Sequence, residues 1–193
     1  LDVSSCVLKH KEIKMNPQTV LDFWFHEAHQ PFWFRKSAEF DAQIRAQFLT
    51  VWQQAAYSEL NHWRTSLQGR LAEIIVLDQF SRNLFRDSPM AFAQDNMAVA
   101  LAQEAVCQTG FTDMQPIERH FMLMPLMHSE SRVIHQQAVP LFEQYTTPYA
   151  LDFEIKHKVI IDRFGRYPHR NQVLGRESTA EEIAFLQEPH SSF

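Results

Sequence analysis

Apolar residues recur along most of the chain at the three- and four-residue spacing of amphipathic helices, and strict alternation of apolar and polar residues is absent. The clearest apolar stripe lies within residues 37–60, where apolar side chains return to one face at each helical turn. The chain has only 4 glycines, whereas sheet proteins of this size need more of them for their turns. The pattern therefore predicts an all-α fold without a sheet.

Start and stop signals divide the pattern into roughly eight or nine helices joined by short links. Asn16 and Pro17 have the residue types of an N-cap and a first helical position. Thr179 and Glu182 have the spacing of a capping box, which predicts the start of the last helix. The other helices are expected near residues 37–60, 68–86, 95–109, 116–127, 131–144 and 148–164.

The length of 193 residues suits one domain, and no linker rich in glycine, serine or proline interrupts it. A single helical domain is therefore expected over residues 15–193. Residues 1–14 differ from the rest in composition, and Met15 resembles a natural start. We expect residues 1–14 to be a leader or an added extension.

Charge and composition disfavour several classes of partner. The formal net charge of -5 repels phosphate backbones, so nucleic acid is not expected as a partner. No apolar run approaches the ~20 residues that span a bilayer, so no membrane partner is expected. Cys6 and Cys107 lack CxxC spacing, which favours reduced thiols and a cytoplasmic location. Known cofactor and metal signatures, HExxH included, are absent, so neither a cofactor nor a metal is predicted.

The helix predicted over residues 68–86 is apolar on nearly all sides, which indicates burial. Asp78, Arg82 and Arg86 nevertheless follow each other at four-residue intervals on one strip of it. Buried charges are costly unless they are partnered. Two interpretations stay open. The three residues form structural ion pairs between helices, or they line a pocket in which Arg82 or Arg86 faces an anionic ligand.

A second polar cluster lies late in the chain, where four arginines and a histidine fall among few acids. Pro168 is expected to start a short helix, whose N-terminus would present N–H groups near the histidine. This combination can hold a carboxylate or a phosphate. The alternative is a basic surface turn that pairs with acids such as Asp162 and Glu177. The cluster consists of Arg163, Arg166, His169, Arg170 and Arg176.

A set of histidines forms the third candidate, together with one glutamate. His157 shares a face with apolar residues, which is typical of a hydrogen-bonded core histidine. His128 and Glu130 follow Pro125, which should kink or end its helix and could expose them to a cavity. The other members of the set are His120 and His135.

Several long and unusual strings resemble the bacterial DUF924 family. They are VLDFWF (20–25), WFRK (33–36), GRLA (69–72), LDQFSRN (77–83), HSE (128–130), RFGRYPHRN (163–171) and LGREST (174–179). The similarity covers about residues 17–193. It implies a tetratricopeptide-like superhelical array of helices and brings no established activity. Its characteristic polar positions correspond to Asp78, Gln79, Arg82, Asn83, His128, Glu130, Arg163, Arg166, His169, Arg170, Asn171, Arg176 and Glu177.

These clusters lead to three functional hypotheses. The first is a helical binding module that holds an anionic small molecule or peptide in an arginine- and histidine-lined pocket. The second is an enzyme for a phosphorylated or carboxylated small molecule, with His128 or His169 as acid or base. It requires the clusters to converge on one pocket. The third is a structural or assembly protein whose charges are paired internally. The sequence leaves the ligand and the oligomeric state open.

Overall fold

The computed structural model describes residues 15–189, 191 and 192, and every regular element within them is helical. The all-α prediction is confirmed. The predicted leader or extension at residues 1–14 lies outside the described residues. None of the described helices combines the length and the apolar character needed to cross a membrane. The α-helices are α1 (Pro17–Trp24), α2 (Ala38–Ala56), α3 (Leu67–Ile75), α4 (Ser81–Leu84), α5 (Asp95–Ala105), α6 (Pro116–His128), α7 (Arg132–Tyr145), α8 (Pro148–Phe164) and α9 (Ala180–Phe185).

Short helical turns connect several of these helices. Five are 3-10 turns, and one, η3, is a π-helical turn that joins α3 to α4. If α3, η3 and α4 are taken as one run, the described chain contains eight α-helical runs, in agreement with the predicted number. The short turns are η1 (Gln30–Phe32), η2 (Asn61–Thr65), η3 (Val76–Phe80), η4 (Pro89–Ala91), η5 (Phe111–Asp113) and η6 (Pro168–Arg170).

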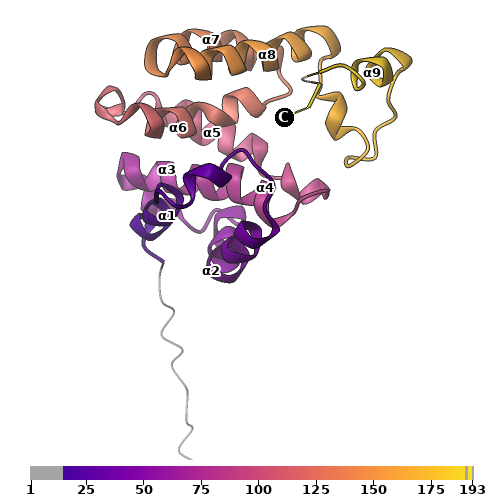
Figure 1. Cartoon of the computed structure of the whole chain (residues 1–193). Helices are drawn as coiled ribbons and strands as arrows, with labels where there is room; N and C mark the ends of the chain where they lie inside the picture. Colours follow the sequence, from indigo (N-terminus) through magenta and orange to yellow (C-terminus); the bar gives the residue numbers. More distant parts are fainter. Residues whose placement is uncertain (1–14, 190, 193) are drawn as a thin grey trace, which may run out of the picture.

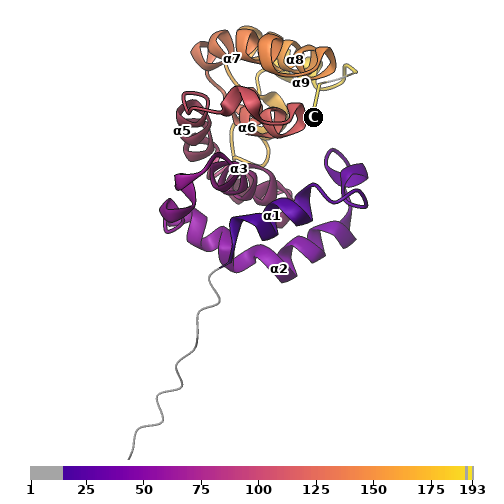
Figure 2. The same cartoon turned by 90° about the vertical axis from the view of Figure 1, so that its left-hand side faces the viewer.

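The helices stack in layers, with α1 and α2 at one end, α3 next to them, then α5 and α6, and α7 with α8 at the other end (Figures 1 and 2). From α5 to α8, each helix packs against the next one in the chain. The segment after α8 leaves this stack and carries α9 to its side (Figure 1). The tetratricopeptide-like superhelical arrangement stays a prediction.

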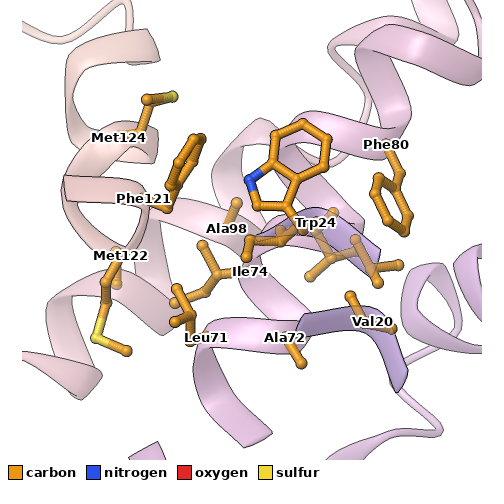
Figure 3. Packing of buried hydrophobic residues seen from close by; sticks show 14 of the residues in the cluster. Val20, Trp24, Leu71, Ala72, Ile74, Phe80, Ala98, Phe121, Met122 and Met124 are labelled. Carbon is orange, nitrogen blue, oxygen red and sulfur yellow. The ribbon is translucent and has the colours of Figure 1, made fainter. Parts of the chain in front are cut away.

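The main hydrophobic core lies between these layers and includes buried residues from Val20 to Ala150. Trp24 of α1 is fully buried at its centre, and the ring of Phe121 meets it edge-on at 5.4 Å (Figure 3). Aromatic rings add large buried areas and favour this tilted geometry. A smaller cluster, formed by Ile160, Ile161, Tyr167 and Phe185, packs the late segment against α8. These contacts place the late basic cluster beside the main helical stack.

The helix predicted over residues 68–86 differs from the observed structure in two ways. Its middle is the π turn η3, which inserts a wider turn between α3 and α4. It also ends at Leu84, because Phe85 leaves the helical region and Asp87 has a positive φ of 58°. Arg86 therefore does not continue the strip that Asp78 and Arg82 begin. Single π turns inside α-helices frequently accompany functional sites.

Pro125 does not end its helix, because α6 continues through it to His128. Ser129 then adopts an extended conformation and ends the helix. His128 therefore occupies the last helical position, and Glu130 follows in the link to α7. Both residues form hydrogen bonds to the late segment of the chain, His128 through its backbone carbonyl oxygen and Glu130 through its carboxylate.

Candidate functional site

Asp78 of η3 is the centre of a buried hydrogen-bond network, with an exposed fraction of 1%. Its carboxylate accepts hydrogen bonds from His128 Nδ1 at 2.7 Å and from Gln79 Nε2 at 2.6 Å. Arg82 Nη1 lies 3.0 Å from the same carboxylate, one helical turn along. A buried carboxylate is stable only with such partners. The π turn thus holds an ionised group against the end of α6.

Asp95, the first residue of α5, connects the two polar clusters predicted from the sequence. It accepts two hydrogen bonds from Arg82, at 3.0 and 3.1 Å, and one from Arg170 Nη1 at 3.0 Å. Arg170 Nη2 also donates to the backbone carbonyl of His128 at 3.0 Å. In Figure 1, the gold segment after α8 comes down beside the pink segment between α4 and α5. The two clusters, far apart in sequence, therefore meet at one place.

The network fixes the protonation states of Asp78 and His128. Burial alone would raise the pKa of Asp78, but the Arg82 charge and the contacts with His128 and Gln79 hold it well below its usual range. Burial lowers the pKa of His128, and the Arg82 charge lowers it further, which outweighs the opposite effect of Asp78. His128 is therefore neutral at neutral pH. Because a carboxylate only accepts, the His128 proton is on Nδ1.

A pocket of about 230 Å³ opens beside this network. His128 and Arg170 lie in its wall, so the histidine set and the late basic cluster each contribute to this hollow. Asp78 and Arg82 contact the wall residues His128 and Asp95. Apolar side chains from the segment between α4 and α5 and from the late segment complete the wall. The lining residues are Pro89, Phe92, Ala93, Asp95, Asn96, His128, Ser129, Glu130, Arg170 and Leu174.

Glu130 and Arg176 form a second ion pair at the edge of the pocket. Arg176 donates to both carboxylate oxygens, at 2.6 and 2.9 Å, and the Tyr167 backbone N–H donates at 2.7 Å. Burial would raise the pKa of Glu130, but these hydrogen bonds and the charges of Arg170 and Arg176 hold it below its usual value. Bidentate pairs of this kind fix orientation. The pair therefore anchors the late segment against the end of α6.

Two of the predicted arginines lie outside the pocket. Arg163 Nε is 2.9 Å from Glu181, and Arg166 donates to both oxygens of Glu182, at 2.7 and 2.8 Å. Both acids belong to α9, so these pairs join α9 to the end of α8. The structure gives Arg163 and Arg166 a role in docking α9 and does not bring them to the pocket.

Asn83 and Arg86 also point away from the pocket, toward Asp41 of α2. Asn83 Nδ2 donates to Asp41 at 2.8 Å, and Arg86 forms a two-pronged ion pair with the same carboxylate. These contacts tie the end of α4 to α2. Of the residues predicted to bind a ligand, Arg170 lines the pocket, as does His128, which was predicted as a catalytic candidate. Asp78, Arg82 and Arg176 contact the wall through His128, Asp95 and Glu130.

His169, the other predicted acid or base, lies behind the wall and does not line the pocket. Its Nδ1 is buried and has no hydrogen-bond partner among the described residues. Burial, followed by the Arg170 charge, lowers its pKa to about 4. The interpretation of His157 as a core histidine is confirmed, because it is buried and its Nδ1 lies 2.7 Å from the Phe153 carbonyl. His128 is thus the histidine with access to the pocket.

Asp95 and Phe92 are site residues that the sequence analysis missed. The Phe92 ring lies under both guanidinium groups, 4.5 Å from that of Arg170 and 5.6 Å from that of Arg82. Such cation–π contacts help to hold buried arginines. Asp95 begins the helix predicted over residues 95–109, a position where an acidic residue is common. No signal in the sequence distinguishes Asp95 from an ordinary acidic residue in the first turn of a helix.

A larger hollow of about 750 Å³ lies elsewhere, between α1, η1 and the start of α6. Amide and apolar side chains dominate its wall, with Asp22, His26 and Glu118 as its ionisable members. Asp22 and Glu118 already accept hydrogen bonds from Gln18 and from the Gln115 backbone. The smaller pocket is the better candidate because it adjoins buried groups with shifted pKa values, among them His128 and Arg170. Over the described part of the chain, no group of three or more histidine, cysteine or acidic side chains is arranged to hold a metal.

Comparisons with known proteins agree with this picture of the fold. A solved structure of a protein of unknown function from Agrobacterium tumefaciens is similar to this chain, with a TM-score of 0.84 and 34% identity. The match covers 89% of this chain and 96% of that one. No curated protein matches. Residues 20–190 match the model of the family described as bacterial protein of unknown function DUF924. The chain therefore belongs to the bacterial DUF924 family.

Proposed function

We propose that the pocket binds a small molecule carrying a carboxylate, held between Arg170 and His128. The observation that carries this proposal is the state of the Arg170 guanidinium, which lines the pocket with an exposed fraction of 6%. Each of its two terminal nitrogens carries two hydrogens. The hydrogen bonds to Asp95 and to the His128 carbonyl use one hydrogen on each. The remaining donors suit a carboxylate.

Electrostatics around Arg170 favour an added negative charge. Burial lowers its pKa, and the neighbouring Arg82 charge lowers it further, although Asp95 acts in the opposite direction. Asp95, which pairs with Arg170, is shared with Arg82. An anion in the pocket would give Arg170 a partner of its own.

The protonation state of His128 also affects the net charge of the site. The carboxylates and guanidinium groups of the site match in number, namely Asp78, Asp95 and Glu130 against Arg82, Arg170 and Arg176. Protonation of His128 would give the site one positive charge in excess. A bound carboxylate stabilises that protonated form, so binding raises the pKa of His128. Carboxylate affinity should accordingly increase as the pH falls through that raised pKa.

The size of the pocket selects between the ligand classes expected from the sequence. Pockets for drug-sized ligands typically enclose ~300–1,000 Å³. The volume of about 230 Å³ suits a smaller molecule and favours it over a peptide segment. We also propose that this binding takes place in the cytoplasm and that nucleic acid is not a partner. The free thiol of Cys107 and the net charge of -5 support that setting.

Filling the pocket should weaken carboxylate binding. Ala93 is exposed and lines the pocket, and its side chain is outside the ion-pair network. Ala93→Trp is expected to weaken acetate binding by ~10-fold or more, which corresponds to ~1.4 kcal/mol. Titration calorimetry at pH 6 and pH 8 provides the measurement, with tighter binding expected at pH 6.

Ala100→Trp is the matched control, because Ala100 is also exposed and belongs to α5 but does not line the pocket. It should bind acetate as the wild type does. Equal affinities for the wild type and Ala93→Trp, or no detectable heat in the wild type at millimolar acetate, would exclude this pocket as a carboxylate site.

A further inference from the structure

His128 and Asp78 form a dyad at the pocket wall. Asp78 is buried and binds His128 Nδ1 at 2.7 Å, which fixes both the ring orientation and the position of its proton. Within the described chain, Nε2 of His128 has no hydrogen-bond partner. Because Nδ1 is occupied, Nε2 is the ring nitrogen left to serve the pocket that His128 lines. A neutral imidazole with a free, oriented nitrogen is the usual form of a general base.

The Arg170 guanidinium stands beside this base. Its Nη2 donates to the backbone carbonyl of His128 itself, at 3.0 Å, and both residues line the same pocket. Positive donors that are already in place stabilise an oxygen on which negative charge develops. The wall therefore combines a proton acceptor and a site for an oxyanion, the two groups that ester hydrolysis requires.

We propose that His128 is the general base for hydrolysis of a small carboxylic ester bound in this pocket. Its Nε2 accepts a proton from water while the water oxygen forms a bond to the carbonyl carbon. The π electrons of the carbonyl move onto its oxygen, beside Arg170. The electron pair then returns, the bond to the leaving alcohol oxygen breaks, and His128 gives its proton to that oxygen. The products are a carboxylic acid, which ionises at neutral pH, and an alcohol.

This inference rests on the proposed function, because the acid released is the class of anion that the pocket is proposed to bind. It adds a reaction to that binding. The pocket volume of about 230 Å³ restricts the acyl group to a small one. Asp78 would be a positioning residue, since it touches His128 and not the ester.

The pH dependence of the reaction would follow the charges that surround His128. Asp78 and Asp95 raise its pKa, and Arg82 lowers it. The rate should rise with pH as His128 loses its proton, and level off above its pKa. Removing the Asp78 charge should move this rise to lower pH. The other titratable or charged groups around the ring come from α6, α8 and the late segment, and are His120, His157, His169 and Arg170.

Hydrolysis of p-nitrophenyl acetate by the full chain tests the proposal. The wild type should turn over this ester, and His128→Gln should lower the rate ~100-fold or more, to the uncatalysed level. His62→Gln is the matched control, because His62 is exposed and does not line the pocket, and the rate of this variant should be unchanged. Should His128→Gln fail to fold, Ala93→Trp serves in its place, since it fills the pocket and leaves the dyad intact.

Asp78→Asn separates positioning from simple stabilisation. Among molecules that remain folded, it should lower kcat with little change in KM, and it should shift the rise of the pH profile to lower pH. Equal rates for the wild type and His128→Gln, or a wild-type rate no greater than that of free imidazole at the same concentration, would overturn the catalytic inference. Acetate calorimetry on the same samples distinguishes the two proposals. Intact binding without hydrolysis rejects only the reaction, whereas absent binding rejects the proposed function.

Discussion

Replacement of Asp78 by alanine is expected to lower the free energy of unfolding by ~3–5 kcal/mol. Asp78 has an exposed fraction of 1%, and its removal leaves Arg82 and His128 without the carboxylate that they share. Arg82 retains its ion pair with Asp95, but the fully buried negative charge of the network is lost. Urea denaturation followed by circular dichroism gives the measurement.

Asp152→Ala is a matched control, because Asp152 also pairs with a cation four residues later. That pair, with Lys156, is exposed on α8, with side-chain exposures of 56% and 43%. Exposed pairs of this type contribute little, so a change within ~0.5 kcal/mol is expected. Equal effects for Asp78→Ala and Asp152→Ala would contradict the account of the network.

The effect of Asp78 should also depend on pH. Its pKa is lower in the folded chain than in the unfolded chain, so its contribution is fully present above the ordinary aspartate pKa of ~4. The contribution is lost as the pH falls from there toward the lower pKa of the folded state. The difference between wild type and Asp78→Ala should therefore be larger at pH 7 than at pH 3.

Gly69→Ala is expected to destabilise the protein by ~3 kcal/mol or more, although alanine is the better helix former by ~1 kcal/mol. Gly69 lies in the first turns of α3, against the end of η2. A Cβ atom at this position would lie 1.9 Å from the Trp63 carbonyl oxygen and 2.8 Å from its carbon. Both are backbone atoms, so the overlap is relieved only by moving α3 away from η2. The thermal midpoint measured by calorimetry should fall accordingly.

Gly175→Ala provides the comparison for this prediction. Gly175 has a φ of +64°, and nothing lies within 4 Å of a Cβ built there. The substitution should cost only the left-handed strain of ~1–2 kcal/mol. A protein with Gly69→Ala that is as stable as the wild type, or more stable, would show that the contact between α3 and η2 is not tight.

Most of the fold could be predicted from the sequence because helix boundaries have local causes. Ser66 and Thr179 accept hydrogen bonds from backbone N–H groups of their helices, as capping residues do. The π turn η3 had no such local signal. Its residues read as a continuous α-helix, and the turn is recognised only from the backbone itself. The end of the helix at Leu84 also lacked a local signal. For that reason Arg86, expected on one strip with Arg82, pairs with Asp41 instead.

The candidate site could be predicted only in part. Buried charges among apolar residues pointed to Asp78 and Arg82, because unpartnered charges are expensive in a core. The partner of Arg82 and Arg170 was not predictable, since Asp95 looks like any acid at a helix start. Local charge density also could not separate Arg170 from Arg163. Arg170 lines the pocket and pairs with Asp95, whereas Arg163 pairs with Glu181 of α9. This difference depends on tertiary contacts.

Arg170 and His128 are proposed to hold a small carboxylate between them. The most direct test is nuclear magnetic resonance of the His128 ring nitrogens, recorded from pH 5 to pH 8 with and without saturating acetate. We predict a neutral ring protonated on Nδ1 in the free protein, and a raised His128 pKa with protonated Nε2 when acetate is bound. Ring signals and a titration of His128 that acetate leaves unchanged would contradict it.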